Sequence, residues 1–309
     1  MNRRYRRHAA CAFLLLLLLL SACASAVHAP DSAVFDGDGA LLSRRLSARG
    51  YTESQIQMLF SELRFFEITP LLVFDVQADL APYIADCHAH ADVNSSGFFK
   101  LSGTYNTPFD RADPVPEALK ATMLVNKNNY LSADYAPNDM QSVPDAYCLD
   151  DGDTYELCRE ALTSLLVWAD AASEAGASFI LERATRPYSR QQEVYDYYLE
   201  KFDGDRAAVE KICARPGFSE HQTGYVVDLR SVDKTAENNL LYKDSKAFAF
   251  TKETCADYGW ILRYPEGKEL ITGYSYEPWH YRYVGVELAQ SVKESCLTYD
   301  EYYSLFLKP

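Results

Sequence analysis

The segment SEHQTGYVVDL, residues 219–229, limits how the chain around it can fold. Its second half is an apolar run of strand length, whereas its first half is polar. In one straight strand, His221 and Asp228 would lie about 23 Å apart, at about 3.3 Å per residue. Gly224 stands between them and can adopt a positive φ at little cost. For both side chains to serve one site, the chain must bend at Gly224, before a strand that carries Asp228.

A second segment, YEPWHYRY at 276–283, has the periodicity of a strand. Trp279, Tyr281 and Tyr283 alternate with His280 and Arg282. A period of two is typical of a strand, in which successive side chains point to opposite faces. We therefore expect His280 on the face opposite to the aromatic residues.

The remaining patterns predict helices and short strands that do not alternate strictly. An amphipathic pattern predicts a helix over 154–175 with Asp153 as its N-cap. Ser189 and Gln192 have the spacing of a capping box, so a second helix is expected to open there and to run to 202. We also expect strands at 177–181, 225–229, 260–263 and 279–283, a helix at 246–258, and C-terminal helices. This order favours an α+β fold in which helices flank a small antiparallel sheet.

Composition divides the chain into five parts. Apolar positions at helical spacing predict a small helical N-terminal region, and a stretch rich in Pro, Asn and Asp predicts an extended lead-in to the main domain. The expected parts are a signal peptide (1–22), a tether (23–38), the helical N-terminal region (39–105), the extended lead-in (106–150) and the main domain (151–309).

The N-terminus has the layout of a secretory signal. Four arginines without an acidic residue precede the apolar run 9–20, which ends in Leu-Ser-Ala-Cys at 20–23. These four residues resemble the bacterial lipobox, whose cysteine is acylated and becomes the mature N-terminus. The apolar run is shorter than the roughly 20 residues of a membrane-spanning helix, which argues against an uncleaved anchor. We therefore expect an exported envelope lipoprotein, anchored to the bacterial membrane through Cys23.

The cysteine count and the net charge bear on disulfide formation and on the choice of partner. An even number of cysteines follows Cys23, and in an exported chain this favours disulfides. Cys148 and Cys158 flank a short acidic turn, so we predict a disulfide between them, with free thiols as the alternative. The formal net charge is −14, and such a chain repels a phosphate backbone, so nucleic acid is not expected as a partner.

His221, Asp228 and His280 are the candidate ligands for one zinc ion. Two imidazoles and a carboxylate form a three-ligand set with the fourth position open, as in catalytic zinc sites. Glu277 is a spare carboxylate beside His280, and its natural role is that of a general base. Taken singly, each histidine could instead be an ordinary core residue.

A rival group of metal-binding residue types occurs at Cys87, His88, His90 and Asp92. It lacks a second ligand pair at any recognised spacing, which favours a loop in the helical region over a metal site.

The two segments, with GWILRYPEGKELITGYSY between them, resemble the VanY-type D-alanyl-D-alanine carboxypeptidases of the LAS metallopeptidase group. That group shares the pattern Ser-x-His-x-x-Gly-x-Ala-x-Asp followed by Glu-x-x-His, and the match covers roughly residues 150–290. The resemblance implies a LAS-type zinc peptidase domain over 151–309. It also implies zinc ligands at His221, Asp228 and His280, with Glu277 as the base.

The family also has a Gly-Tyr-Arg-Ser-Tyr segment with a glutamine shortly after it. ATRPY at 184–188, followed by Gln191, stands in that place, and Val226 replaces the family alanine. The resemblance implies that Arg186 stabilises the oxyanion or clamps a substrate carboxylate, as a planar guanidinium suits. It also implies substrate contacts for Tyr188 and Gln191. Ser219 either contacts the substrate or caps a turn.

We therefore expect a zinc D,D-carboxypeptidase that removes the terminal D-alanine from peptidoglycan stem pentapeptides. One alternative is an L,D-carboxypeptidase that acts on tetrapeptide stems. The other is a wall-binding lipoprotein that keeps the fold without turnover.

Overall fold

The computed structural model describes residues 38–89, 101, 103–109, 112–232 and 242–308. The predicted signal peptide, the predicted acylation site Cys23 and most of the predicted tether lie outside these residues. In the described part, no helix is both long and apolar enough to cross a membrane.

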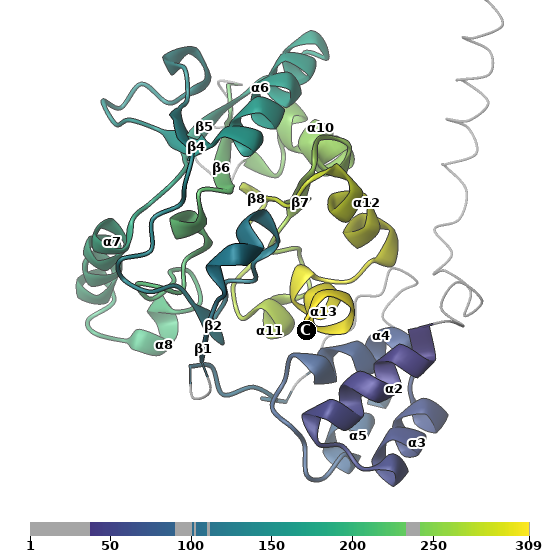
Figure 1. The fold of residues 1–309 in the computed structure, drawn as a ribbon. Coiled ribbons are helices and arrows are strands. Elements are labelled where there is room, and N and C mark those ends of the chain that lie inside the picture. The colour runs from purple at the N-terminus through teal and green to yellow at the C-terminus, as the bar shows by residue number, and fades with distance from the viewer. Residues whose placement is uncertain (1–37, 90–100, 102, 110–111, 233–241, 309) are drawn as a thin grey trace, which may run out of the picture.

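A four-stranded antiparallel sheet forms the centre of the main part of the molecule (Figure 1). Its strands, in spatial order, are β5 (Phe179–Arg183), β6 (Val226–Ser231), β8 (His280–Tyr283) and β7 (Trp260–Leu262). Every neighbouring pair is antiparallel, which confirms the predicted α+β fold. The central strands β6 and β8 carry the two segments that the sequence marks as functional.

Helices surround this sheet, and α6 packs its apolar stripe against it. Trp168 of α6 stacks on Trp260 with ring centres 6.0 Å apart and meets Phe179 and Tyr281 edge to face. The described helical elements after Cys158 are α6 (Arg159–Glu174), α7 (Tyr188–Lys201), α8 (Arg206–Val209), η5 (Glu220–Thr223), α10 (Lys246–Thr254), η6 (Cys255–Tyr258), α11 (Glu269–Thr272), α12 (Val286–Ser295), α13 (Tyr299–Tyr302) and the π-helical turn η7 (Tyr303–Leu307).

The segment that precedes α6 carries short strands that pair locally and two short 3₁₀ helices. Its elements are β1 (Asp113–Pro114), η3 (Glu117–Thr122), β2 (Asn129–Tyr130), β3 (Met140–Ser142), η4 (Asp145–Tyr147) and β4 (Glu156–Cys158). β1 pairs with β2 and β3 with β4. The apolar stretch 123–125 within this segment is buried.

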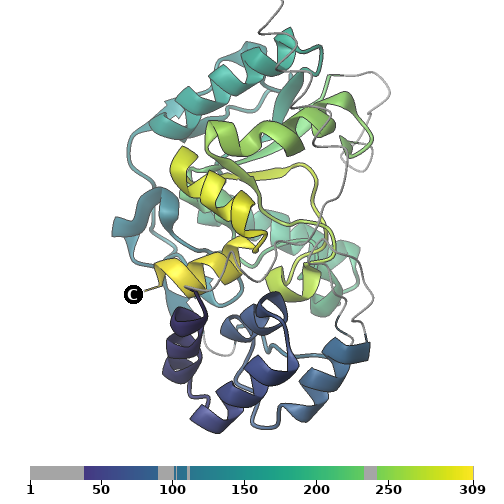
Figure 2. The ribbon, with the colours of Figure 1, turned by 90° about the vertical axis from the view of Figure 1, so that its right-hand side faces the viewer.

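The N-terminal region is helical, as predicted, and packs against the C-terminal helices (Figure 2). Its helices are α2 (Asp38–Arg49), α3 (Glu53–Glu62), α4 (Phe65–Ile68), η2 (Thr69–Leu72) and α5 (Ala81–Ala89). Its apolar core includes Leu297 and Leu305 from the C-terminal end. The Thr69 hydroxyl also donates a buried hydrogen bond of 2.7 Å to Glu301. The first and last thirds of the sequence therefore share one core.

Two predicted helix starts are wrong. The helix predicted from residue 154 begins at Arg159, and its N-cap is Cys158 instead of Asp153, because residues 156–158 pair with β3. The capping box at Ser189 does not form. α7 begins earlier, at Tyr188, with Pro187 in the N-cap position and no side-chain cap.

The predicted disulfide between Cys148 and Cys158 is also wrong, since all six cysteines in the described part are free thiols. The backbone of Cys148 bridges to Leu181 of β5. The Cys158 thiol lies instead beside Met140, 3.7 Å from its sulfur. The two cysteines thus pair with different strands, Cys148 with β5 and Cys158 with β3.

Candidate active site

A 3₁₀ turn followed by a left-handed glycine carries the first part of the site. The Ser219 hydroxyl caps η5 by accepting a 3.3 Å hydrogen bond from the backbone N–H of His221. Gly224 then adopts φ +80°, which turns the chain into β6. The bend that the sequence requires at Gly224 is confirmed.

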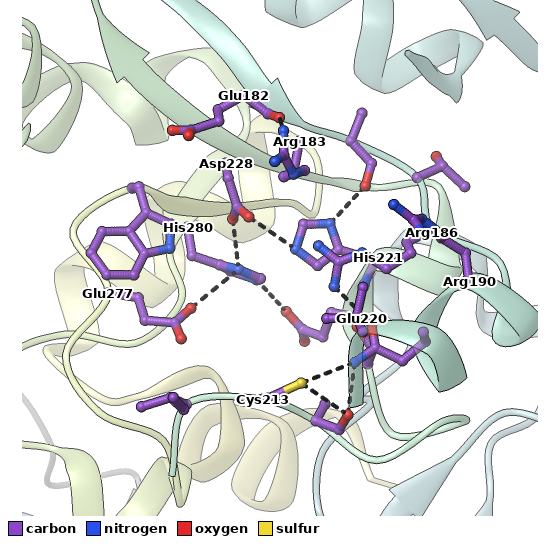
Figure 3. Close-up of a pocket in the computed structure, with 18 of the residues that line it drawn as sticks. Glu182, Arg183, Arg186, Arg190, Cys213, Glu220, His221, Asp228, Glu277 and His280 are labelled. Carbon is purple, nitrogen blue, oxygen red and sulfur yellow. Dashed lines mark hydrogen bonds and ion pairs between the residues drawn. The ribbon is translucent and has the colours of Figure 1, made fainter. Parts of the chain in front are cut away.

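Strand pairing brings the three predicted zinc ligands together (Figure 3). Asp228 on β6 lies directly opposite His280 on β8. Asp228 Oδ2 is 3.3 Å from His221 Nε2, and Asp228 Oδ1 is 3.1 Å from His280 Nδ1. All three residues are buried, and each offers a ligand atom within 4.8 Å of the others. Among the described residues, this is the group that could hold a metal ion.

The hydrogen bonds around these side chains suit a metal ligand set. His221 Nδ1 lies 2.6 Å from the carbonyl oxygen of Ala184, so Nδ1–H donates there and Nε2 keeps its lone pair for the site. Asp228 Oδ1 is buried without a hydrogen-bond partner. Burial raises the pKa of Asp228, but His221 and His280 outweigh this and lower it well below its usual range. A buried carboxylate with spare acceptor capacity between two imidazoles fits a divalent cation.

Glu277 lies beside this group, within the same pocket. Its Oε2 is 3.4 Å from His280 Nδ1 (Figure 3). Burial raises the pKa of Glu277 to about 8, although His280 opposes the shift. A carboxyl group with a raised pKa can take up and release a proton near neutral pH, as general acid–base catalysis requires.

Arg186 reaches the pocket from the loop between β5 and α7. Its backbone N–H donates to the carbonyl oxygen of His221 at 2.9 Å, and its Nη1 donates to Gln191 Oε1 at 2.7 Å. Burial lowers the pKa of Arg186, and the Asp228 carboxylate opposes that shift. Gln191 is almost fully buried and also donates to the carbonyl oxygen of Ala214. Gln191 therefore holds Arg186 in position.

The pocket has a volume of about 660 Å³ and contains most of the predicted site residues. Tyr188 does not line it, and its ring lies instead beside Gly217. The predicted site residues that line the pocket are Arg186, Gln191, Ser219, His221, Asp228, Glu277 and His280.

Comparison with known proteins identifies related carboxypeptidases. The family model of VanY, D-alanyl-D-alanine carboxypeptidase, matches residues 154–286. A putative carboxypeptidase of Bacillus subtilis (strain 168), YodJ, is 34% identical over 212 residues, which cover 66% of this chain and 76% of YodJ. This chain belongs to the VanY family of carboxypeptidases.

The solved structures that resemble this chain include an LD-carboxypeptidase and a D,D-pentapeptidase. The LdcB LD-carboxypeptidase superposes with a TM-score of 0.57 at 32% identity, covering 64% of this chain and 92% of LdcB. The D,D-pentapeptidase VanY of a VanB-type resistance cassette, an E175A mutant in complex with Zn(II), gives a TM-score of 0.50 at 31% identity. This match covers 59% of this chain and 98% of the D,D-pentapeptidase chain.

The VanY-family site includes residues that the sequence analysis missed. The Tyr264 ring lies 4.7 Å from the His280 ring, and the Tyr274 ring lies 4.9 Å from that of Tyr264. Glu220 is buried behind His280. Burial raises the pKa of Glu220, but the charges of Arg263 and other groups outweigh it and lower the pKa to about 2. No motif spacing marks Tyr264 and Tyr274, which come close to His280 only through the fold. Glu220 stands next to His221, but its contact with His280 also depends on the fold.

The rival metal cluster is only partly described. Cys87 is buried in α5, and His88 Nε2 lies 3.0 Å from the carbonyl oxygen of Glu62. These two residues lie on a helix, where the sequence analysis favoured a loop. His90 and Asp92 lie outside the described residues.

Proposed function

We propose that this protein is a zinc-dependent D,D-carboxypeptidase that removes the terminal D-alanine from peptidoglycan stem peptides. Membership of the VanY family supports the coarser activity, that of a carboxypeptidase on peptidoglycan peptides. The observation that carries the proposal is the grouping of His221, Asp228 and His280 in one pocket with Glu277.

The side chains present suit one zinc ion, which His221, Asp228 and His280 would hold. Two imidazoles and one carboxylate leave a fourth position open to the pocket, as in catalytic zinc sites. When bound, zinc would polarise the scissile carbonyl and increase the acidity of a water molecule.

Glu277 and Arg186 would perform the remaining steps of hydrolysis. The Glu277 carboxylate would accept a proton from the attacking water and then deliver it to the leaving amine. Arg186, held by Gln191, would donate hydrogen bonds to the negative charge that develops on the former carbonyl oxygen. The Ser219 hydroxyl lines the pocket, but it also caps η5, so we assign it a positioning role first.

An L,D-carboxypeptidase that acts on tetrapeptide stems is the second candidate. The structural likeness to the LdcB LD-carboxypeptidase favours it, since that chain gives a higher TM-score than the D,D-pentapeptidase does. Both candidates share the ligands and the base, and they differ in the stereochemistry of the residue before the cleaved bond.

The decisive experiment offers the purified protein synthetic pentapeptide and tetrapeptide stems and measures the amino acid that each releases. We expect D-alanine from the pentapeptide, no release after chelation, and recovery when zinc is restored. Glu277→Gln should abolish release while it preserves zinc binding, because Glu277 is placed as the base and not as a ligand. Glu193→Gln is the matched control, since Glu193 lines the same pocket but pairs with Arg190 at its exposed rim.

The outcomes separate the candidates. Faster release from the tetrapeptide would replace the D,D assignment by the L,D one. A protein that binds zinc and releases nothing from either stem would support the alternative of a wall-binding lipoprotein without turnover.

We also propose that the protein is exported and anchored through an acylated Cys23, with the five-part division given above. The signal layout supports this proposal, although it lies outside the described residues. Metabolic labelling with a radioactive fatty acid should mark the wild type and not Cys23→Ser. Labelling of both proteins would contradict acylation at Cys23.

A further inference from the structure

Glu220, the residue before His221, connects the candidate metal ligands to a buried charge cluster. Its side chain is fully buried. Its Oε1 accepts a 2.8 Å hydrogen bond from Arg263 Nε, and its Oε2 faces His280 Nε2 at 3.5 Å (Figure 3). The carboxylate therefore lies between the arginine and the outer nitrogen of a ligand histidine.

The cluster holds the Glu220 carboxylate in a fixed orientation. Arg263 Nη1 also lies 2.5 Å from Asp300 Oδ2, and Asn126 Nδ2 donates to Asp300 Oδ1 at 2.7 Å. Arg282 Nη1 is 3.6 Å from Glu220 Oε1. Two buried guanidinium groups thus attract Oε1, which leaves Oε2 directed at His280.

Two buried atoms are left facing each other. Glu220 Oε2 and His280 Nε2 are both inaccessible to solvent and make no regular hydrogen bond. Buried polar atoms are normally paired, because an unpaired one loses its hydration without compensation. A proton on His280 Nε2 would satisfy both atoms and would leave Nδ1 unprotonated, where it faces Asp228 at 3.1 Å.

We propose that Glu220 is a positioning residue that accepts a hydrogen bond from His280 Nε2–H and so fixes the tautomer and ring orientation of His280 for zinc. Outer carboxylates of this kind orient ligand histidines and make them more basic. This inference rests on the proposed zinc function and adds a residue to it that touches neither zinc nor substrate.

Glu220→Gln tests the contact with little change in volume. Arg263 can only donate, so the new amide would turn its oxygen to Arg263 and its NH₂ group to His280. His280 Nε2 would then have to accept, which moves the proton to Nδ1, the nitrogen needed for zinc. We expect the zinc dissociation constant, measured by competition with a chromogenic chelator, to rise about 10- to 100-fold.

Asp300→Asn is the matched control. It removes a charge from the same cluster but leaves both arginines on Glu220 and leaves Glu220 facing His280. We expect it to lower the urea midpoint of unfolding as Glu220→Gln does, and to keep the zinc dissociation constant within about threefold of the wild type. An equal loss of zinc affinity in both variants would overturn the proposal, because it would show general loosening of the cluster.

A measurement on the wild type keeps the test independent of how the variants fold. Nitrogen-15 NMR of the zinc-loaded protein should show His280 protonated at Nε2, and protonation at Nδ1 would overturn the proposal. A wild type that binds no zinc would refute the proposed function itself. If the wild type binds zinc and Glu220→Gln binds it equally tightly, only the role proposed for Glu220 is refuted.

Discussion

Gly224→Ala should damage both folding and zinc binding, because two separate costs meet at this position. The residue has φ +80°, where an alanine loses about 1–2 kcal/mol. A Cβ atom there would also lie 2.7 Å from the Cys158 sulfur and 3.1 Å from both Met140 Sδ and Pro137 Cβ. Overpacking of this kind costs about 1–3 kcal/mol, so the free energy of unfolding should fall by about 2–5 kcal/mol.

Gly152→Ala separates the two costs. Gly152 has nearly the same backbone angle, φ +82°, but a Cβ atom there would meet nothing within 4 Å. We expect this variant to lose only the conformational part, about 1–2 kcal/mol. It should also bind zinc normally, because it lies outside the turn that joins His221 to Asp228.

Equilibrium urea unfolding of the two variants gives the difference directly, provided that the m-value stays constant. Zinc affinity measured on the same samples reports whether the clash shifts His221 relative to Asp228. The reasoning fails if Gly224→Ala loses no more stability than Gly152→Ala and binds zinc as the wild type does. In that case, neither the close packing at Gly224 nor the bend would govern the site.

Two further predictions concern charged residues in and beside the pocket. Arg186→Lys should lower kcat/KM about 100- to 1000-fold without changing zinc affinity, because an ammonium cannot donate to Gln191 and to the oxyanion in the same geometry. Burial lowers the pKa of Lys127 from 10.5 in the unfolded chain to about 8 in the folded protein. Between these values the unfolded state binds more protons, so this residue favours folding increasingly as pH rises from 8 to 10.5. The free energy of unfolding of the wild type, relative to Lys127→Met, should therefore rise by up to about 3 kcal/mol across that window, and a flat difference would contradict the shift.

The sequence, with its family resemblance, was sufficient to predict that His221, Asp228 and His280 lie close together. A glycine between His221 and Asp228 allows one bend, and strand alternation around His280 decides which face the imidazole occupies. The pairing of β6 with β8 then brings Asp228 opposite His280. In both segments the polar site residue alternates with apolar neighbours, so strand periodicity predicts that Asp228 lies opposite to the face of Val227 and Leu229, and His280 opposite to that of Tyr281.

Element boundaries were less predictable, because tertiary pairing competes with local propensity. The amphipathic pattern before Arg159 is genuine, since Leu157 is buried, but those residues pair with β3 instead of extending the helix. Ser189 has the spacing of a cap, yet Pro187 starts the helix earlier. Cys148 and Cys158 are close in sequence, but they are drawn to different strands.

The buried charge cluster on the Nε2 side of His280 could not be predicted from the sequence. Glu220 stands at the unspecified position between Ser219 and His221 in the family pattern. Its carboxylate contacts Arg263 and Arg282, and Arg263 in turn pairs with Asp300. A helical residue next to Asp300, Glu301, accepts the hydrogen bond from Thr69 of the N-terminal region. The N-terminal region therefore contacts α13, the helix that carries Asp300 of the charge cluster. Two short sequence patterns were enough to mark His221, Asp228 and His280 as candidates. The groups that hold Glu220 against His280 come from distant segments, and only the folded chain reveals them.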